Sequence, residues 1–183
     1  MLTITELFAK TRKIADAKKW DKVFIMVDVH ETILESDYVN DSENFTYYDK
    51  SIEALKRLSD NPFYELILWT SCDDDRAFQY LNEFEKFGIE FSYFNSNPEV
   101  QNTTYARFES KFYFNIILDD KAGFDALSDW QEIIEYLDFE EDFQKKQKVI
   151  HYAKKVHERL RGVVSLVQIH EVLENLESVK LDE

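Results

Sequence analysis

Side chains that can do chemistry follow several apolar segments of this chain. Asp28, His30 and Thr32 come at the end of the apolar run 23–27. The other such residues are Thr70 and Ser71 after the run 66–69, Lys111, and the pair Asp119 and Asp120 after the run 116–118. An apolar run that ends in a carboxylate is typical of a buried strand whose last residue reaches the edge of a sheet. We therefore expect these groups to meet at one edge.

A cluster that joins Asp28 to Asp119 and Asp120 would carry strong electrostatic repulsion. Two like charges about 4 Å apart repel by about 4 kcal/mol at an effective dielectric constant of about 20. Protons, basic partners or a metal ion would relieve this repulsion. Magnesium suits the task because it binds a few carboxylate oxygens and keeps waters that a phosphate can replace. The sequence therefore predicts Mg²⁺ as a cofactor at these residues.

Hydroxyl and ammonium groups near such a cluster predict a phosphoryl group as the ligand. Thr70 or Ser71, at a neighbouring strand end, can donate a hydrogen bond to a phosphate oxygen. Lys111 precedes Asp119 by eight residues, and its ammonium can neutralise a transferring phosphoryl group. Asp28 can act as the nucleophile, because carboxylates form aspartyl-phosphate intermediates.

Strand and helix patterns alternate along most of the chain. Apolar runs predict strands at 23–28, 64–70, 91–94 and 112–120. Amphipathic patterns predict helices at 4–20, 51–60, 73–88 and 124–137, and residues 35–48 are expected to form a loop or small insertion. The alternation predicts an α/β, Rossmann-like core with a mostly parallel sheet and flanking helices. Ligands of such sheets bind beyond the carboxyl ends of the strands.

The last forty or so residues differ in character from the rest. A coiled-coil-like spacing of four and three residues joins Val149, Ala153, Val156, Leu160, Val163 and Val167. We predict two domains, an α/β core with a minimal cap at 1–140 and a C-terminal helical extension at 141–183. The extension can pack on its own core, or it can contact another protein or a second copy of the chain.

The charge and composition narrow the classes of partner. The chain carries a formal charge of -15, from 37 acidic and 22 basic residues. This charge disfavours broad contact with nucleic acid or anionic membranes. No apolar run approaches the roughly 20 residues of a membrane span, and the N-terminal segment lacks the apolar core of a signal peptide. We expect a soluble, cytoplasmic protein.

Other catalytic classes lack their signatures here. The single cysteine, Cys72, rules out an intramolecular disulfide and a cysteine-based zinc site. The chain has only three glycines, Gly88, Gly123 and Gly162, so no glycine-rich phosphate loop is present. Kinases and nicotinamide-dependent dehydrogenases are therefore disfavoured.

Four motifs occur in the order found in the haloacid dehalogenase-like (HAD) superfamily of phosphotransferases and hydrolases. The first is Asp28-Val29-His30-Glu31-Thr32, where that family has Asp-x-Asp-x-Thr. The others are the strand end LILWTS at Thr70, then Lys111, then the strand end IILDD at Asp119 and Asp120. The segment 22–137 resembles this family, and the stretches LWTS, FNSNPEV and KFYFNIILDDKAGFD resemble its small members with minimal caps.

The resemblance implies a role for each matching acidic residue. Asp28 would be the nucleophile and a metal ligand. The backbone carbonyl of His30 and the carboxylate of Asp120 would be further ligands, and Asp119 would assist them as a ligand or a support. A magnesium-dependent phosphohydrolase with an aspartyl-phosphate intermediate is the implied activity.

The same resemblance implies that Thr70 and Lys111 hold the phosphoryl group. About 30 residues separate Asp28 from the next strand, and about 40 separate Thr70 from Lys111, which is too few for a large cap domain. We therefore expect an open active site. The expected substrate is a small phosphomonoester that the sequence does not identify, and a phosphate at a nucleic-acid end stays open as an alternative.

The first motif departs from the family at two positions. His30 stands where HAD phosphatases carry the second aspartate, their general acid and base, which is worth about 10² to 10⁴ in rate. Glu31 stands where the family usually has glycine, and adds a negative charge. Three alternatives follow. His30 can replace the acid and base; the enzyme can be slow or restricted to good leaving groups; or the chain is a catalytically impaired binding or scaffold protein whose C-terminal helices contact a partner.

Each candidate residue also has a purely structural interpretation. Thr70 can cap the helix that begins near Asp73. Asp119 and Asp120 can begin a loop or cap a helix. Lys111 can be an ordinary exposed lysine. The spatial arrangement decides between these interpretations and a shared site.

Overall fold

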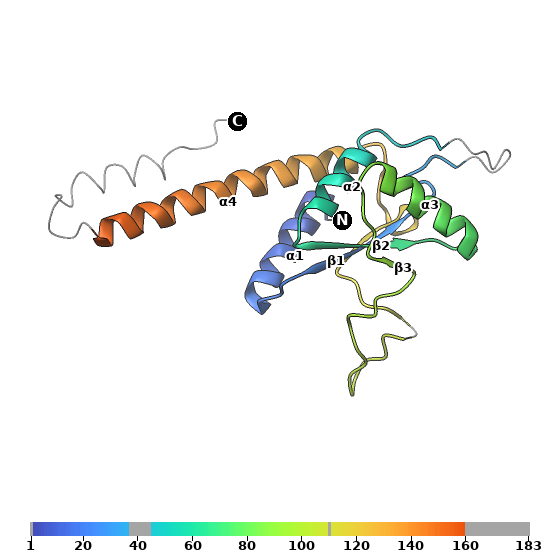
Figure 1. Cartoon of the computed structure of the whole chain (residues 1–183), viewed down its shortest axis with the longest axis horizontal. Helices are drawn as coiled ribbons and strands as arrows, with labels where there is room; N and C mark the ends of the chain where they lie inside the picture. Colours follow the sequence, from blue (N-terminus) through green and yellow to red (C-terminus); the bar gives the residue numbers. More distant parts are fainter. Residues whose placement is uncertain (1, 37–44, 110, 160–183) are drawn as a thin grey trace. The chain divides into compact units, whose positions relative to one another are not determined.

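The computed structural model describes residues 2–36, 45–109 and 111–159 of the 183-residue chain. Figure 1 shows the path of the chain. In chain order, its elements are α1 (Ile4–Lys18), β1 (Val23–Asp28), α2 (Ser51–Asp60), β2 (Tyr64–Trp69), α3 (Asp74–Lys86), β3 (Tyr93–Phe94), β4 (Ile116–Leu118), the 3₁₀ helix η1 (Asp120–Ala122) and α4 (Asp129–Arg159).

The four strands form one parallel sheet in the order β3-β2-β1-β4. β1 lies inside the sheet, and its residues 23–27 are all buried, as expected for a strand covered on both faces. Helices α1, α2 and α3 flank the sheet (Figure 1). The predicted α/β, Rossmann-like fold with a parallel sheet, flanking helices and a C-terminal helix is therefore confirmed.

The first helix shows how the sequence pattern produces this packing. α1 buries Ile4, Phe8, Thr11 and Ala15, which follow one another at intervals of four, three and four residues. The Phe8 ring meets the Tyr64 ring of β2 edge to face, with centroids 5.9 Å apart. This spacing places one apolar stripe of the helix on the sheet.

The helix ends follow the expected capping rules. Thr3 and Glu6 form the capping box that begins α1. At the start of α3, the side chain of Asp73 accepts a hydrogen bond of 2.9 Å from the Arg76 amide. Asp73, and not Thr70, is therefore the N-cap, so the capping interpretation of Thr70 is wrong. Gly88 follows α3 with a positive φ of 71°, which favours glycine at this helix end.

The last strand is shorter than the sequence predicts. The prediction of a strand at 112–120 is wrong in length, since β4 covers Ile116–Leu118 alone. Just before β4, the side-chain oxygen of Asn115 accepts a 2.8 Å hydrogen bond from the amide of Phe24. This side chain takes up a backbone donor of β1 that a longer β4 would have bonded. The segment 112–114 therefore leaves the sheet, whereas the Asn115 amide still donates to the Phe24 carbonyl at 2.8 Å.

The helix after β4 begins later and runs further than predicted. Residues 124–128 form a turn in which the amides of Ser128 and Asp129 donate to the carbonyl of Asp125. The helix therefore begins at Asp129 and not at residue 124. α4 then continues without a break to Arg159, across the boundary predicted at 140/141. The extension thus begins as a continuation of a core helix.

The chain divides near this point into two compact units, Met1–Tyr136 and Leu137–Glu183. In the second unit, Val149 and Val156 of the predicted apolar seam are 48% and 53% exposed. The seam positions Leu160, Val163 and Val167 lie outside the described residues, and the predicted domain boundary and partner of the extension stay predictions. Along the described ranges, no helix is both long enough and apolar enough to cross a membrane.

Candidate functional site

Three carboxylates meet at the carboxyl edge of the sheet. Asp28 is the last residue of β1, and Asp119 and Asp120 directly follow β4, which pairs with β1. One ligand oxygen of each residue lies within 4.8 Å of those of the other two. Within the described ranges, this is the one group of three or more acidic, histidine or cysteine residues with such spacing. The expected meeting of these three acids is confirmed.

Burial and repulsion make ionisation of Asp28 costly. The pKa of its carboxyl is raised from 3.8 to about 6, first because burial removes water and second because Asp119 and Asp120 are negative. A hydrogen bond from the Val29 amide and the charge of Lys121 act in the opposite direction. The site therefore lacks enough positive charge of its own to hold three ionised acids together.

Asp119 has a structural role besides its place in the cluster. Its carboxylate accepts hydrogen bonds from the amides of Lys121 and Ala122, at 2.7 and 3.3 Å, and so caps η1. The capping interpretation of Asp119 is therefore confirmed. These amides bond to one carboxylate oxygen, Oδ1, and hold the side chain in place at the edge of the sheet.

Thr32 connects the two loops that carry the acids. Its side chain is fully buried, and Oγ1 accepts a 3.2 Å hydrogen bond from the amide of Asp120. Its carbonyl accepts a buried 2.9 Å hydrogen bond from Nε1 of Trp130. The threonine of the first motif thus fixes the distance between the loop after β1 and the loop after β4. Thr32 belongs to the first motif, but neither of its partners could be predicted from the sequence.

His30 points toward helix α3. Its Nε2 lies 2.9 Å from the hydroxyl of Tyr80, and Nε of Arg76 donates to the same hydroxyl over 3.1 Å. A guanidinium only donates, so the Tyr80 oxygen accepts from Arg76, and the hydrogen between Tyr80 and Nε2 lies on one or the other according to the tautomer of His30. Sequence analysis missed Tyr80 and Arg76, which share a helical spacing of four but carry no motif.

The His30 ring also borders a polar cavity of about 420 Å³ at the start of α3. Cys72, Asp75 and Gln79 line it together with Arg76 and Tyr80. The cavity mixes acidic, basic and amide groups, so a small polar molecule has donors and acceptors to meet beside the imidazole.

Glu31 adopts a backbone conformation that favours glycine, with φ of 56°. Its carboxylate accepts hydrogen bonds from the Tyr48 hydroxyl at 2.6 Å and the Ser36 amide at 3.3 Å. The hydrogen bond from Tyr48 is the main cause that lowers the pKa of Glu31, and it raises the pKa of Tyr48 to about 12. The negative charge that Glu31 adds to the motif is thus stabilised by hydrogen bonds from Tyr48 and Ser36.

Thr70 is buried and tightly held at the end of β2. The side chain of Asn95 accepts a 2.9 Å hydrogen bond from the Thr70 amide and donates a 2.6 Å hydrogen bond to the Thr70 carbonyl. Thr70 Oγ1 accepts a 3.3 Å hydrogen bond from the Cys72 amide. Ser71 beside it is exposed. Phosphate binding by Thr70 and Ser71 stays a prediction.

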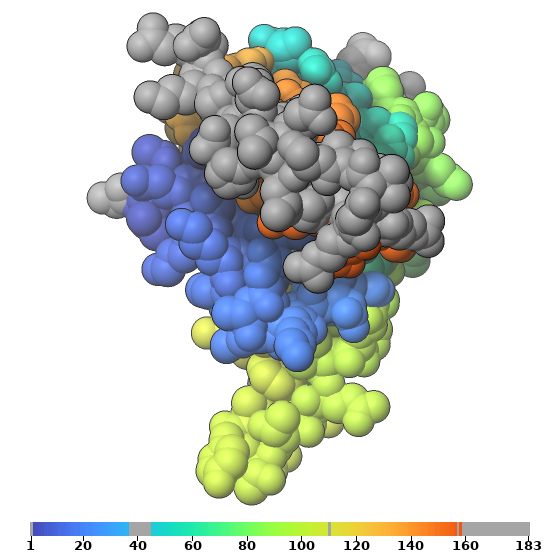
Figure 2. Space-filling model, turned by 90° about the vertical axis from the view of Figure 1, so that its left-hand side faces the viewer, coloured from blue at the N-terminus to red at the C-terminus, as the bar shows by residue number. Residues whose placement is uncertain are grey.

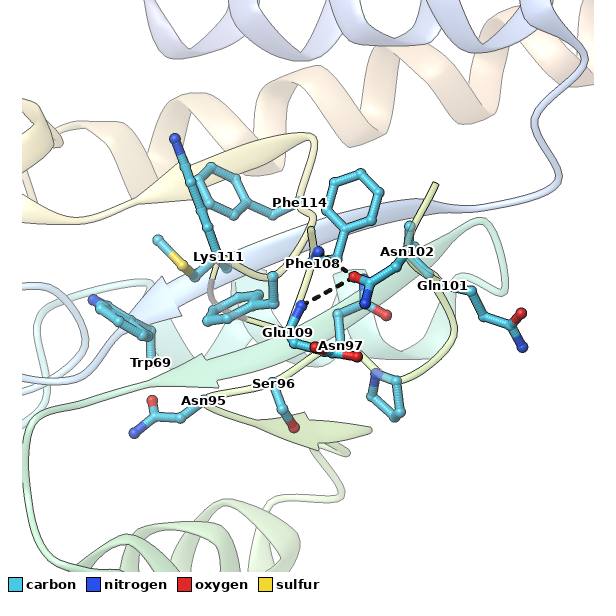
Figure 3. Close-up of a pocket in the computed structure, with 14 residues that line it drawn as sticks. Trp69, Asn95, Ser96, Asn97, Gln101, Asn102, Phe108, Glu109, Lys111 and Phe114 are labelled. Carbon is cyan, nitrogen blue, oxygen red and sulfur yellow. Dashed lines mark hydrogen bonds between the residues drawn. The ribbon is translucent and has the colours of Figure 1, made fainter. Parts of the chain in front are cut away.

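The two lysines near the site differ from expectation. Lys121, which sequence analysis passed over, forms an ion pair with Asp120 and lowers the pKa of Asp28. Lys111 is exposed and forms no hydrogen bond or ion pair with another described residue. Its side chain lines a separate cavity beside Trp69 (Figure 3). The cation in contact with the acids is thus Lys121, and the role of Lys111 stays a prediction.

Comparisons with known proteins place few limits on this site. No family model matches the chain, and no curated protein is significantly similar. A solved structure described as the conserved protein coded by locus from Bacteroides thetaiotaomicron is similar at 23% identity, with a TM-score of 0.49. The similarity covers 65% of this chain and 92% of that one. At this level it carries no information about activity.

Proposed function

We propose that this chain is a magnesium-dependent phosphohydrolase of the HAD type with an open active site. The observation that carries the proposal is the meeting of the Asp28, Asp119 and Asp120 carboxylates at the carboxyl edge of a parallel sheet. The order of the four sequence motifs supports it as well. Neither feature alone would distinguish a phosphohydrolase from another acidic α/β protein.

The three acids suit a hard divalent cation. Oxygens around Mg²⁺ at about 2.1 Å lie about 3 to 4 Å from one another, and the three ligand oxygens here lie within 4.8 Å of one another. A small closing movement of the side chains would therefore bring them into range. All three donors are carboxylates, and burial of Asp28 favours any cation that offsets its charge.

In the proposed reaction, a carboxylate oxygen of Asp28 attacks the phosphorus of a phosphomonoester and forms an aspartyl-phosphate, while the P–O bond to the leaving group breaks and the departing oxyanion takes any proton it needs from water. Water then hydrolyses this intermediate and releases inorganic phosphate. The metal, when bound, would supply positive charge that offsets the acids and the phosphoryl oxygens. Lys121 holds Asp120, and Thr32 keeps the two loops together. Thr70 and Lys111 are the candidates for contact with the phosphoryl group.

The position of His30 favours slow turnover of poor leaving groups. The expected general acid has to protonate the departing oxygen, but the Nε2 atom of His30 is engaged with the hydroxyl of Tyr80. We therefore expect the best activity with leaving groups that need no protonation. A protein that binds phosphoesters without turnover is the second candidate, favoured by the same contact.

A panel of phosphomonoesters with and without Mg²⁺ tests the proposal. The account predicts release of phosphate that requires Mg²⁺ and is lost in Asp28→Asn. Asp21→Asn is the matched control, since Asp21 is an exposed aspartate ahead of the same strand. Turnover that survives in Asp28→Asn would contradict the proposed nucleophile. If no ester is hydrolysed while the folded protein still binds Mg²⁺, the second candidate is correct.

A further inference from the structure

A second cavity, of about 800 Å³, lies beside the end of β2 (Figure 3). This volume is within the range of small-molecule sites, about 300 to 1,000 Å³. Its walls combine aromatic and polar residues, which come from the segment between β3 and β4 together with Met26 of β1 and Trp69 of β2. The aromatic residues are Trp69, Phe108, Phe112 and Phe114.

The cavity lies on the face of the sheet that carries the Asp28 side chain. In the parallel pair of β1 and β2, Asp28 is the register partner of Trp69. Register partners point to the same face of a sheet, and so do residues two apart along a strand. Met26 and Trp69 both line the cavity. The cavity therefore begins level with Asp28 and extends back past Met26, a span of about 6.6 Å along the strand.

Amide side chains hold the walls in place. Asn97 is 5% exposed and donates to the carbonyl of Tyr113 at 2.8 Å. Asn102 accepts from the amide of Phe108 at 2.6 Å, and this bond is drawn in Figure 3. The side chain of Asn95 bonds the backbone of Thr70. These hydrogen bonds fix the backbone that carries the aromatic side chains of the cavity.

Two of the aromatic rings contact each other and offer a surface for a flat group. The centroids of Trp69 and Phe112 are 5.5 Å apart with their planes inclined by 56°, and Trp69 remains 37% exposed at the rim. The polar groups at the cavity include the exposed side chains of Gln101 and Lys111. The exposed rim carries one acid, Glu109, and one cation, Lys111, so a ligand with a flat ring against the aromatic residues would place an anion at its other end beside Lys111.

We propose that this cavity binds the leaving group of the substrate, and that the substrate is a nucleoside 5′-monophosphate, whose alkoxide is a poor leaving group and is therefore expected to turn over slowly in the absence of a general acid. The proposal rests on the phosphohydrolase function argued above. The sugar separates the base from phosphorus by several bonds, which gives the reach from Asp28 into the cavity. The base then lies against Trp69 and Phe112, and Lys111 lies near the phosphate end. Stacking of a base on an aromatic side chain is sequence-tolerant, so we expect little preference between bases.

Two measurements test this proposal separately from the hydrolase proposal. The first is the binding of adenosine 5′-monophosphate to the metal-free full chain, measured by calorimetry. Phe112→Leu is expected to weaken binding about tenfold, because loss of one stacking contact is worth about 1 to 3 kcal/mol. If Phe112→Leu does not fold, the same loss of nucleotide affinity is measured in Phe108→Leu, which changes another wall of the cavity. Phe78→Leu is the control, because Phe78 is an exposed residue of α3.

The second measurement compares kcat/KM for adenosine 5′-monophosphate and glycerol 3-phosphate, which has no ring. We expect the nucleotide to be preferred at least tenfold, and Phe112→Leu to reduce this ratio about tenfold. Equal kcat/KM for the two esters, or absence of nucleotide binding, would overturn the cavity proposal while leaving the hydrolase intact. Phe112-dependent binding without hydrolysis of either ester would support the cavity and contradict the hydrolase.

Discussion

The amide of Asp120 donates a 3.2 Å hydrogen bond to Oγ1 of Thr32, and this bond joins the loops that follow β1 and β4. Asp28 lies in the strand before the first loop, and Asp119 and Asp120 begin the second. The Thr32 carbonyl also accepts a hydrogen bond from Nε1 of Trp130, so both the side chain and the backbone of Thr32 are held in place. The geometry of the acidic cluster thus depends on a residue that contributes no charge.

Thr32→Val tests this dependence. Valine has nearly the same shape but no acceptor, so the part-buried amide of Asp120 loses its partner. We expect a loss of about 1 to 2 kcal/mol in the free energy of unfolding, and weaker binding of Mg²⁺. Thr32→Ser, which keeps the hydroxyl, is expected to bind Mg²⁺ more tightly than the valine variant. Urea unfolding and magnesium titration measure both. Equal Mg²⁺ affinity for wild type and Thr32→Val would contradict the role given to this bond.

The raised pKa of Asp28 predicts a specific dependence of stability on pH in the metal-free protein. A carboxyl whose pKa is higher in the folded chain stabilises the fold when protonated. This contribution is full below about pH 4 and is lost as the pH rises through about 6. Asp28→Asn is therefore expected to be more stable than wild type at pH 8 and equal to it near pH 4.

The expected gain at pH 8 is about 1 to 2 kcal/mol, since two pKa units correspond to about 3 kcal/mol and partial exposure of the group reduces this. Urea unfolding in the presence of a chelator measures the difference at several pH values, with Asp21→Asn as the control. Added Mg²⁺ is expected to stabilise the wild type but not Asp28→Asn, by linkage of binding to folding. A less stable Asp28→Asn at pH 8 would show that the carboxylate is not under repulsion.

The contact between His30 and Tyr80 predicts an unusual gain of activity. His30→Asp restores a short carboxyl group, the general acid of the resembled family, at this position. We expect turnover of esters with poor leaving groups to rise about 10- to 100-fold, with little change for good ones. His151→Asp, at an exposed position of α4, is the control for the added charge. A fall in turnover for both kinds of ester would mean that His30 already serves as the acid.

The hydrogen bond between Tyr48 and Glu31 predicts a second dependence on pH. The pKa of Glu31 is lowered mainly by this bond, so its contribution to stability is present above about pH 4.5 and is lost at lower pH. Tyr48→Phe is expected to cost about 1 kcal/mol at pH 7, because the bond is partly exposed. The difference from wild type should shrink below pH 4. Tyr105→Phe, where the tyrosine is 98% exposed, is the control, and a cost that stays constant with pH would contradict this assignment.

The meeting of the acids at one edge of the sheet could be predicted from the sequence, because local apolar patterns indicate which strands are buried and in what order they follow one another. The run 23–27 is apolar throughout and becomes the buried strand β1. Its terminal carboxylate and the one that follows β4 must then reach the same edge of a parallel sheet. The approach of Asp28 to Asp119 and Asp120 follows from these facts without knowledge of any contact.

Other features depend on contacts between distant residues and left no local signal. The predicted strand at 112–120 shortens to Ile116–Leu118, since the Asn115 side chain takes up the Phe24 amide that a longer β4 would have bonded. Tyr80 reaches His30 across 50 residues of sequence. Lys121 stands beside Asp120 in the sequence, but its ion pair there depends on the turn that Asp119 caps. None of these follows from periodicity or composition.

The most direct test of the account is a diffraction experiment on crystals grown with MnCl₂ in place of Mg²⁺. Anomalous scattering locates the manganese ion independently of any assumption about activity. The account predicts one Mn²⁺ ion at the carboxyl edge of the sheet, about 2.2 Å from carboxylate oxygens of Asp28 and Asp120. A fully formed edge without manganese, or manganese bound elsewhere, would contradict the claim that these acids share a cation.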